Sequence, residues 1–465
     1  MKIKLAKKEI IHFIGIGGIG MSGLALIMKG QGFKVQGSDI INNKNIERLK
    51  KQKIKIYLDQ SQKNLKNATI AVISSAIKKN NPELVEAKRR KILIIKRGEM
   101  LASIVSLLKN IVVVGSHGKT TTTSLITSIF QETKIDPTII NGGVINSIKN
   151  NAKLGKSDWS VLEADESDGS FVHIAPTYSI ITNVDREHMD YYESIKDLKN
   201  HFIKFINKTP SFGKSFICND DKINRDLIKL IKNKNFYTFG QKKNSNFIIS
   251  NIKQSKFFSE FNLKVKLPNK KILNIKSFKI PLFGMHNIRN AVGAIGVALT
   301  IGIPIPKIKL GLINFKGVQR RFNKIFSYND IEFYDDYAHH PTEIKVVLQG
   351  MKNVFKKFEK VCIFQPHRIS RLKDLKREFT YAFKDADTVI LCPIYSAGEK
   401  IKLGFSYNEF ARELIKNSNV KLFMVKNNHE LAKYLKKNMY GKKIIVGMGA
   451  GSISNWIKEL PNLMK

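Results

Sequence analysis

The most constraining feature of the sequence is the stretch 111–122, in which the apolar, β-favouring run IVVV is followed by GSHGKTTT. Residues 121–131 then have the apolar spacing of an α-helix. A strand, a glycine-bounded turn and a helix form a phosphate-binding unit, because backbone N–H groups and the positive end of the helix dipole face the turn. Lys119 can reach the outer phosphates of ATP, and the Thr120 hydroxyl suits Mg²⁺. The sequence therefore predicts an ATP site formed by Gly115, Ser116, His117, Gly118, Lys119, Thr120 and Thr121.

This motif is shorter than the full phosphate-loop pattern. The full pattern G-x-x-x-x-G-K-[ST] requires glycine at position 113, where the sequence has Val113, so only G-x-x-G-K-T is present. A chance G-K-T in a loop is the alternative interpretation. The strand before the turn and the helix after it favour the ATP site.

Composition sets limits on the partners of the chain. A formal net charge of +42 is typical of proteins that bind nucleic acid or an anionic membrane surface. Here, however, the basic residues are mostly lysines, spread along the whole chain together with abundant Ile and Asn, which is the pattern that an A+T-rich genome produces. We therefore expect neither nucleic acid nor a membrane as a partner.

Three features predict a cytoplasmic, soluble protein. The N-terminus lacks the apolar stretch and the cleavage site of a signal peptide. The uncharged apolar run 291–306 is shorter than the ~20 residues that span a bilayer. Cys218, Cys362 and Cys392 lie in apolar runs without C-x-x-C spacing, so we expect buried thiols in a reducing compartment.

The first part of the chain has the pattern of a nucleotide-binding fold. The stretch 12–23 is a predicted strand that runs into a glycine turn, followed by a helix over 24–30 and a strand over 34–36. Ser38 and Asp39 follow, which places a carboxylate about twenty residues after the glycines, as in dinucleotide-binding folds. Taken alone, this pattern favours NAD. A strand over 69–73 ends at Ser74 and Ser75, whose hydroxyls lie at the ligand-binding edge of the sheet or form a plain turn.

Two further strands carry charge at their ends. The strand over 159–162 runs into the acidic stretch 163–168, and the strand over 178–182 runs into 183–190, which contains His188. If both strands are parallel to 111–114, their carboxyl ends converge beside the triphosphate. Oxygen ligands suit Mg²⁺, so the sequence predicts a candidate magnesium site, with a solvated acidic turn as the alternative.

The second half of the chain contains three further polar clusters. Alternating residues between about 240 and 280 predict half-exposed strands, and a buried helix opens at 284–290, where Asn287 is either an adenine reader or a helix cap. Arg320 and Arg321 stand near a domain junction and can approach phosphates. Beyond them, strands over 331–334, 361–364, 388–391, 421–425 and 443–446 alternate with helices. The clusters 335–343 and 365–371 follow two of these strands and predict a carboxylate-binding surface, with surface turns as the alternative.

These patterns together predict a three-domain α/β protein. We expect a Rossmann-like N-terminal domain at 1–108, a central P-loop ATPase-type α/β domain at 109–319 and a C-terminal Rossmann-like α/β domain at 320–465. An ATP site, a second nucleotide-type site and a carboxylate site favour ATP-driven ligation over hydrolysis or simple phosphorylation.

The chain resembles the Mur ligases of peptidoglycan synthesis over essentially its whole length. The motifs that carry the resemblance are 12–23, 37–39, 74–77, 115–122, 163–168, 182–190, 284–290, 317–322, 335–343 and 365–371. The resemblance implies an ATP-dependent ligase that joins L-alanine to the lactyl carboxylate of UDP-N-acetylmuramate through an acyl phosphate. It also implies that the first domain holds UDP, and not NAD, near Gly17, Gly18, Ser38 and Asp39, with Ser74 and Ser75 at the same edge.

The resemblance also assigns roles around ATP and the second substrate. Lys119 is implied to contact the ATP phosphates, and Arg320 to approach them. The residues implied around Mg²⁺ are Thr120, Glu163 and His188. Those implied to face the adenosine are His286, Asn287 and Asn290. Those implied to face the muramoyl and alanine substrates are Tyr337, His339, His367, Arg368 and Arg371. The implied catalytic residues are Lys119, His188 and Arg368.

Two residues depart from the family pattern: Ser116 stands where the family usually has Thr, and Ala338 where it usually has Gly. Two alternatives to the implied function stay open. One is a muropeptide-recycling ligase of the same family, which attaches a whole peptide. The other is an NAD-dependent oxidoreductase, which explains the first domain but leaves Lys119, Glu163 and His188 without a role. We expect a monomer or a weak homo-oligomer.

Overall fold

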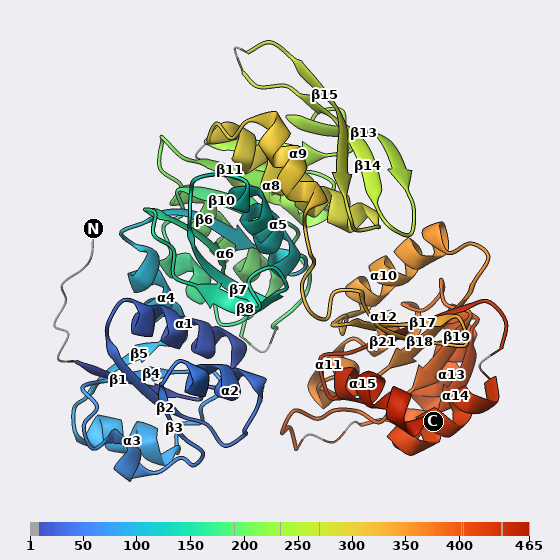
Figure 1. Ribbon diagram of the computed structural model, residues 1–465, viewed down its shortest axis with the longest axis horizontal. Helices are drawn as coiled ribbons and strands as arrows, with labels where there is room; N and C mark the ends of the chain where they lie inside the picture. The colour runs from blue at the N-terminus through green and yellow to red at the C-terminus, as the bar shows by residue number, and fades with distance from the viewer. Residues whose placement is uncertain are drawn as a thin grey trace. The chain divides into compact units, whose positions relative to one another are not determined.

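The computed structural model describes residues 9–189, 191–232, 234–268, 270–400, 402, 404–438 and 440–464. The chain divides into two compact units. The first comprises residues 1–252, 261–280 and 289–316, and the second comprises 253–260, 281–288 and 317–465. Three β-sheets with their helices make up the fold (Figure 1), which confirms the predicted three-domain α/β architecture.

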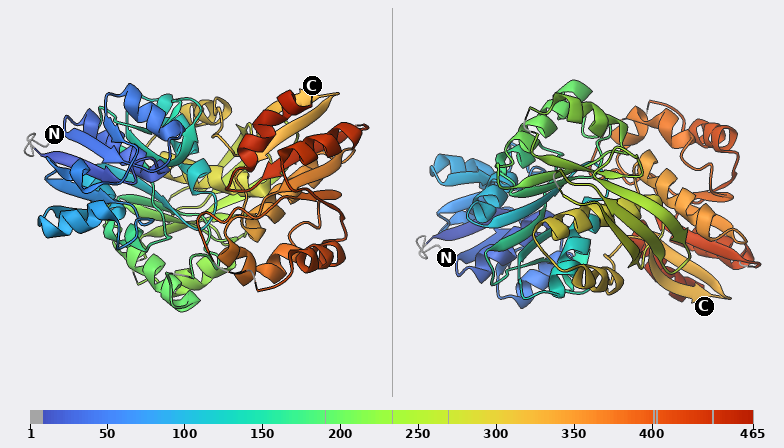
Figure 2. Two further views of the ribbon diagram at one scale, coloured as in Figure 1. Left: turned by 90° about the horizontal axis from the view of Figure 1, so that it is seen from below. Right: turned by 90° about the horizontal axis from the view of Figure 1, so that it is seen from above.

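The first sheet is fully parallel and has the order β3-β2-β1-β4-β5. Its blue strands lie between blue helices in both views of Figure 2, as in a Rossmann-like domain. The elements are β1 Ile10–Ile14, α1 Ile19–Gly30, β2 Lys34–Ser38, α2 Lys44–Lys51, β3 Lys55–Tyr57, the 3₁₀ helix η1 Gln62–Leu65, β4 Ile70–Ile73, α3 Pro82–Arg89, β5 Leu93–Lys96 and α4 Arg97–Val105.

Helix α1 begins at Ile19, so the predicted start at residue 24 was wrong. Gly20 and Gly23, which suggested a longer turn, lie inside the helix at positions where neighbouring side chains come close. A Cβ on Gly23 would lie 2.9 Å from Asn151 Nδ2, and one on Gly20 would lie 3.2 Å from Arg97 Nη1. These glycines allow close packing of the first helix.

The second sheet has the order β15-β14-β13-β12-β11-β10-β6-β9-β7-β8. Strands β10 and β9 pair in parallel with β6, which is the condition on which the predicted convergence depended, so their carboxyl ends meet at one edge. The elements are β6 Lys109–Val114, α5 Lys119–Gln131, β7 Thr138–Ile145, β8 Asn150–Lys153, β9 Trp159–Glu163, η2 Ser170–His173, β10 Tyr178–Ile181, α6 Ile195–Asn207, β11 Lys214–Cys218, α7 Lys222–Leu230, β12 Phe236–Gly240, β13 Phe247–Gln254, β14 Ser259–Val265, β15 Leu273–Ile280, α8 Met285–Thr300 and α9 Ile305–Ile313.

The third sheet has the order β16-β17-β21-β18-β19-β20 and is parallel except for β16. All five predicted strands are present. The elements are β16 Asn323–Tyr328, β17 Ile331–Asp336, α10 Pro341–Val354, β18 Glu359–Phe364, α11 Ile369–Asp374, α12 Lys376–Thr380, β19 Thr388–Leu391, α13 Tyr407–Ser418, β20 Lys421–Met424, α14 Asn428–Asn438, β21 Lys443–Met448 and α15 Ile453–Leu463.

Strand β16 was not predicted. It forms a hairpin with β17 through Asn329 and Asp330, both at positive φ (46° and 62°). Asn and Asp tolerate this conformation and favour two-residue hairpin turns, so the signal was present in the sequence.

Several smaller predictions can be compared with the structure. Cys218, Cys362 and Cys392 are buried free thiols, as expected. Asp190, at the end of the predicted charged stretch 183–190, lies outside the described residues. Among the residues that the structure describes, no helix combines the length and apolar character needed to cross a membrane.

Candidate ATP and substrate sites

The phosphate loop lies between the end of β6 and the start of α5 at Lys119. Gly115 has φ +134° and Gly118 has φ +83°. A Cβ on Gly115 would lie 2.2 Å from Thr182 Oγ1, and one on Gly118 would lie 2.7 Å from Asn290 Oδ1. Both positions therefore require glycine, for backbone conformation as well as for space.

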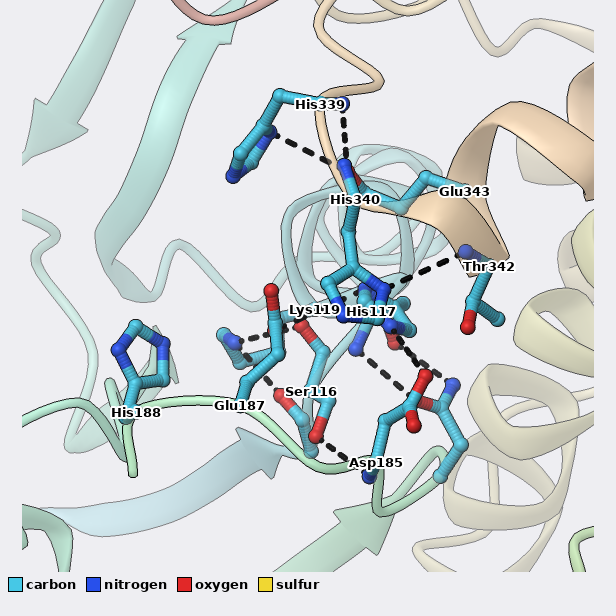
Figure 3. A network of polar contacts seen from close by, with 12 residues as sticks. Ser116, His117, Lys119, Asp185, Glu187, His188, His339, His340, Thr342 and Glu343 are labelled. Carbon is cyan, nitrogen blue, oxygen red and sulfur yellow. Dashed lines mark hydrogen bonds and ion pairs between the residues drawn. The ribbon is translucent and has the colours of Figure 1, made fainter. Parts of the chain in front are cut away.

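The segment after β10 holds this loop in place (Figure 3). The Ser116 and His117 N–H groups donate to the backbone and side-chain oxygens of Asn183, at 3.0 and 2.9 Å. The Asp185 N–H donates to Ser116 Oγ at 2.8 Å, and His117 Nε2 lies 3.2 Å from the Asp185 carboxylate. Ser116 therefore supplies a loop-anchoring hydroxyl at the position where the family usually has Thr.

Lys119 is held by three acceptors at the start of α5. Its Nζ donates to Gly115 O at 2.6 Å, to Ser116 O at 3.2 Å and to Glu166 Oε2 at 2.7 Å. Burial opposes the charge, but the carboxylates of Glu166 and Asp165 outweigh burial and raise the pKa of Lys119. The ammonium group therefore stays charged beside the loop that is predicted to hold phosphates.

A second cluster brings together Asp165, Glu166 and His188, whose ligand atoms all lie within 4.8 Å of one another. Burial raises the pKa of Glu166 to about 8. Burial also acts on Asp165, but Arg97 and Lys119 lower the pKa of that carboxyl to about 2. Glu166 Oε1 is buried without a hydrogen bond and lies 3.7 Å from His188 Nε2. Two carboxylates and an imidazole are a ligand set that fits a divalent cation.

The three residues implied around Mg²⁺ fall into two groups. Thr120 Oγ1 donates to Glu163 Oε2 at 2.9 Å, and the Gly142 N–H donates to the same oxygen at 2.8 Å. His188, by contrast, belongs to the cluster with Asp165 and Glu166. Those two carboxylates were within the predicted acidic stretch but were not singled out, because the sequence alone does not show which members of EADESD turn inward.

Arg97 links the first sheet's domain to this cluster and was not predicted. It is the first residue of α4, and its Nη2 lies 3.2 Å from Asp165 Oδ2 and 3.3 Å from Asp168 Oδ2. The side chain of Arg97 is only 18% exposed, so solvent screens these ion pairs weakly. No local sequence pattern predicts the ion pair between Arg97 and Asp165, because the two residues are nearly seventy positions apart.

At the edge of the first sheet, the glycine turn is tied to the end of β2. The Gly17 N–H donates to Asp39 Oδ2 at 2.9 Å, and the Gly15 and Ile16 N–H groups donate to Ser38 O at 2.9 Å each. The predicted residues Gly17, Ser38 and Asp39 therefore lie together.

The serines of this edge differ from one another. Ser38 is fully buried, and its hydroxyl donates inward to Glu83 Oε2 at 2.5 Å. Ser74 Oγ accepts from the Ala76 N–H at 3.4 Å in a turn after β4, and Ser75 is exposed. Gly18 caps the N-terminus of α1. Because its hydroxyl points inward, Ser38 presents only its backbone to the sheet edge.

The residues implied to face adenosine lie at the start of α8. Asn290 is buried, and its side-chain amide lies so close to Gly118 that a Cβ there would collide with it. The Asn287 amide donates to Phe283 O at 2.8 Å from within the first turn of α8, so this contact does not supply the acceptor that a helix cap requires. The His286 imidazole lies against Gly284, where a Cβ would come within 2.5 Å of Cε1.

In the third domain, Arg320 packs on Tyr337. The Arg320 Nη2 donates to Gly449 O at 2.5 Å, and its guanidinium lies 4.7 Å from the centre of the Tyr337 ring. The Tyr337 N–H donates to Arg320 O at 2.8 Å. Arg320, which is implied to approach the phosphates, and Tyr337, which is implied to face the substrate, are therefore in direct contact.

Three histidines of the third domain, His339, His340 and His367, lie just after the ends of β17 and β18. His339 Nδ1 lies 2.9 Å from Tyr337 O, and the His339 and His367 rings lie 5.9 Å apart. Burial, followed by the charge of nearby groups, lowers the pKa of His367 to about 3, so that this imidazole is neutral at pH 7. The neighbouring His340 caps α10, since its Nδ1 accepts from the Thr342 N–H at 3.3 Å (Figure 3).

Two arginines complete this group. Arg371 Nη1 donates to His367 Nδ1 at 3.3 Å, and Arg368 Nε donates to Glu399 Oε1 at 2.6 Å. All five residues of this group were predicted from the sequence. Tyr337, His339, His367 and Arg371 contact one another in that order. Arg368 directly follows His367 in the chain. Planar guanidinium groups beside the neutral His367 imidazole suit the binding of a carboxylate.

Three family models match the chain in succession. Residues 10–108 match the Mur ligase family, catalytic domain; residues 113–298 match the Mur ligase middle domain; residues 320–451 match the Mur ligase, glutamate ligase domain. Together these matches cover most of the sequence.

Individual relatives are similar over the whole length. The chain is 68% identical to the UDP-N-acetylmuramate--L-alanine ligase of Pelagibacter ubique (strain HTCC1062), with 100% of both chains covered. It is 43% identical to the enzyme of that name from Rickettsia felis, with 97% of this chain and 96% of the relative covered. Among solved structures, the UDP-N-acetylmuramate-alanine ligase of Thermotoga maritima matches with a TM-score of 0.81 and 28% identity, over 97% of this chain and 98% of the other.

Proposed function

Because this chain belongs to the Mur ligase family, we propose that it is an ATP-dependent ligase that joins L-alanine to the lactyl carboxylate of UDP-N-acetylmuramate. The observation that carries this proposal is the 68% identity, over the full length, to a relative named for that reaction. The phosphate loop with its charged Lys119 and the arginine- and histidine-rich loops of the third domain support it.

The proposed reaction begins with transfer of the γ-phosphoryl group of ATP to an oxygen of the lactyl carboxylate, which releases ADP and forms an acyl phosphate. Lys119 stabilises the negative charge that spreads over the phosphoryl oxygens, because its ammonium group is fixed at the loop before ATP arrives. The backbone N–H groups of the loop and the N-terminus of α5 orient the triphosphate.

The second step is amide formation. The amine of L-alanine attacks the acyl carbon, the nitrogen loses one proton, and the tetrahedral intermediate expels inorganic phosphate and leaves the amide. His367, Arg368 and Arg371 hold carboxylates during this step, and their donors stabilise the developing negative charge. Activation as an acyl phosphate is needed because a carboxylate oxygen is a poor leaving group.

We propose Mg²⁺ as the metal cofactor. Asp165, Glu166 and His188 would hold it. Thr120, at the start of α5, and Glu163, at the end of β9, form the second candidate group. When bound, Mg²⁺ neutralises charge on the phosphate oxygens. Glu166 Oε1 is buried without a hydrogen bond, so this oxygen is available as a ligand for the cation.

The remaining assignments follow from the same family membership. We propose that the first domain holds UDP near Gly17, Gly18 and Asp39, and that Asn290 contacts the nucleotide beside Gly118. We further propose that the enzyme acts in the cytoplasm as a monomer or a weak homo-oligomer. Size-exclusion chromatography with light scattering measures that oligomeric state.

The function is tested by phosphate release from ATP with Mg²⁺ and UDP-N-acetylmuramate, with and without L-alanine. We expect release only with both substrates, and loss of release when EDTA removes the metal. Activity with a tripeptide in place of L-alanine would identify a muropeptide-recycling ligase instead. No release with either acceptor would contradict the proposed function.

A further inference from the structure

A tight turn in the third domain places Glu399 against the predicted substrate arginine. In residues 396–399, Ala397 and Gly398 both have positive φ (52° and 83°), and the Glu399 N–H donates to Ser396 O at 3.0 Å. Two successive positive φ values define a type I′ turn, and an alanine in this conformation is strained. The turn thus holds the Glu399 backbone in a defined place.

The segment before this turn is joined to the loop that carries His367 and Arg368. The Arg368 N–H donates to Tyr395 O, and the Tyr395 N–H donates to Pro366 O, both at 2.8 Å. The Tyr395 ring stacks on the His367 ring, with centroids 5.6 Å apart and an interplanar angle of 11°. The two loops therefore form one local structure, so the position of Glu399 relative to Arg368 is fixed by backbone as well as by side chains.

The Glu399 carboxylate contacts two residues of the arginine loop. Oε1 accepts from Arg368 Nε at 2.6 Å and from Ser370 Oγ at 2.7 Å, and Oε2 accepts from the Ser370 N–H at 3.0 Å. A contact at Nε fixes the plane of the guanidinium, and Arg368 itself has a strained φ of +69°.

We propose that Glu399 is a positioning residue that orients the Arg368 guanidinium toward the carboxylate of the incoming amino acid. This inference rests on the proposed function, and it adds a residue that acts through Arg368 without touching the substrate.

The opposite role for Glu399 is that of an internal competitor that occupies Arg368 until a substrate carboxylate displaces it. The contacts argue against competition. Ser370 donates twice to Glu399, so displacement would break three hydrogen bonds at once. Burial acts against the charge of Glu399, but the hydrogen bonds of Ser370 and Arg368 hold the pKa of this carboxyl at about 2, so it stays ionised throughout the neutral range. The two roles predict opposite effects on substrate affinity.

The test is steady-state kinetics of the full-length Glu399→Gln variant, which removes the charge and keeps the side-chain size. We expect the KM for L-alanine to rise about tenfold or more, because a misoriented guanidinium loses a charge-assisted contact, while the KM for ATP changes less than about twofold. Ser370→Ala is expected to change the KM for L-alanine in the same direction by a smaller factor. An unchanged or lowered KM for L-alanine in both variants would overturn the inference.

Two controls separate positioning from a general structural effect. In an Arg368→Ala background, Glu399→Gln is expected to add no further change; a full additional effect would show that Glu399 does not act through Arg368. Glu413→Gln, which removes a carboxylate that pairs with Lys376 at 2.8 Å elsewhere in the domain, is expected to leave every KM unchanged. An inactive wild-type enzyme would instead contradict the proposed function, so the two failures are distinguishable.

Discussion

Replacing Lys119 by alanine is expected to lower kcat by about 10³-fold or more, because the charge that stabilises the transferring phosphoryl group is lost. Three acceptors fix Lys119 Nζ within 3.2 Å, and the surrounding carboxylates keep it charged, so the group is in place before ATP binds. The measurement is phosphate release at saturating concentrations of all three substrates. A kcat within about tenfold of the wild-type value would contradict the role assigned to Lys119.

The control for this variant is Lys109→Ala. Lys109 is the first residue of β6, the strand that leads into the phosphate loop, but it lies in an exposed ion pair with Asp158 at 3.0 Å. Exposed pairs contribute little to stability, so this variant should keep the wild-type kcat. A loss of activity in both variants would point to damage to the central domain.

Removal of Lys119 also has a predictable pH dependence. Without the ammonium group, Glu166 loses the charge that lowers its pKa against burial, so its folded-state pKa stays above the unfolded value. The folded variant then binds more protons than the unfolded chain, and its stability falls as the pH rises through that interval. The loss of melting temperature relative to wild type should be larger at pH 9 than at pH 6, as measured by circular dichroism. An equal loss at both pH values would contradict this account.

The sequence predicts the phosphate loop well because its signals are local. An apolar strand, closely spaced glycines and a helix follow one another within about twenty residues, and each has its own physical reason to form. The convergence of β9 and β10 follows from a general rule of sheet topology, because parallel neighbouring strands bring their polar carboxyl ends to one edge. The boundaries were less accurate: α5 begins at Lys119, two residues before the prediction, since the turn ends directly after Gly118.

The parts that were not predicted depend on long-range contacts. Arg97 meets Asp165 across about seventy residues, Ser38 turns inward toward Glu83, and Glu399 reaches Arg368 from another loop. In each case the residue type allows many partners, and only tertiary packing selects one. A motif shows which residues lie at a sheet edge, but the direction of each side chain is decided by partners far away in the sequence.

Replacing Gly115 by alanine is expected to destabilise the first unit by about 2–4 kcal/mol, through backbone strain and overpacking together. Gly115 has φ +134°, and an added Cβ would lie 2.2 Å from Thr182 Oγ1 and 2.7 Å from Asn183 O. Thr182 Oγ1 donates to His117 O at 2.7 Å, so moving Thr182 to relieve the clash would loosen the phosphate loop itself. Both the melting temperature and the affinity for ATP should fall, as measured by calorimetry.

Gly302→Ala separates strain from collision. Gly302 also has a positive φ of +86°, but nothing lies within 4 Å of the Cβ that would be added there. This variant should therefore lose only the strain contribution of about 1 kcal/mol and keep its affinity for ATP. If the two variants lost equal stability, contact with Thr182 would contribute nothing, and the requirement for glycine at 115 would be one of backbone conformation alone. A larger loss at Gly115, accompanied by weaker ATP binding, would mean that the segment after β10 determines the shape of the phosphate loop.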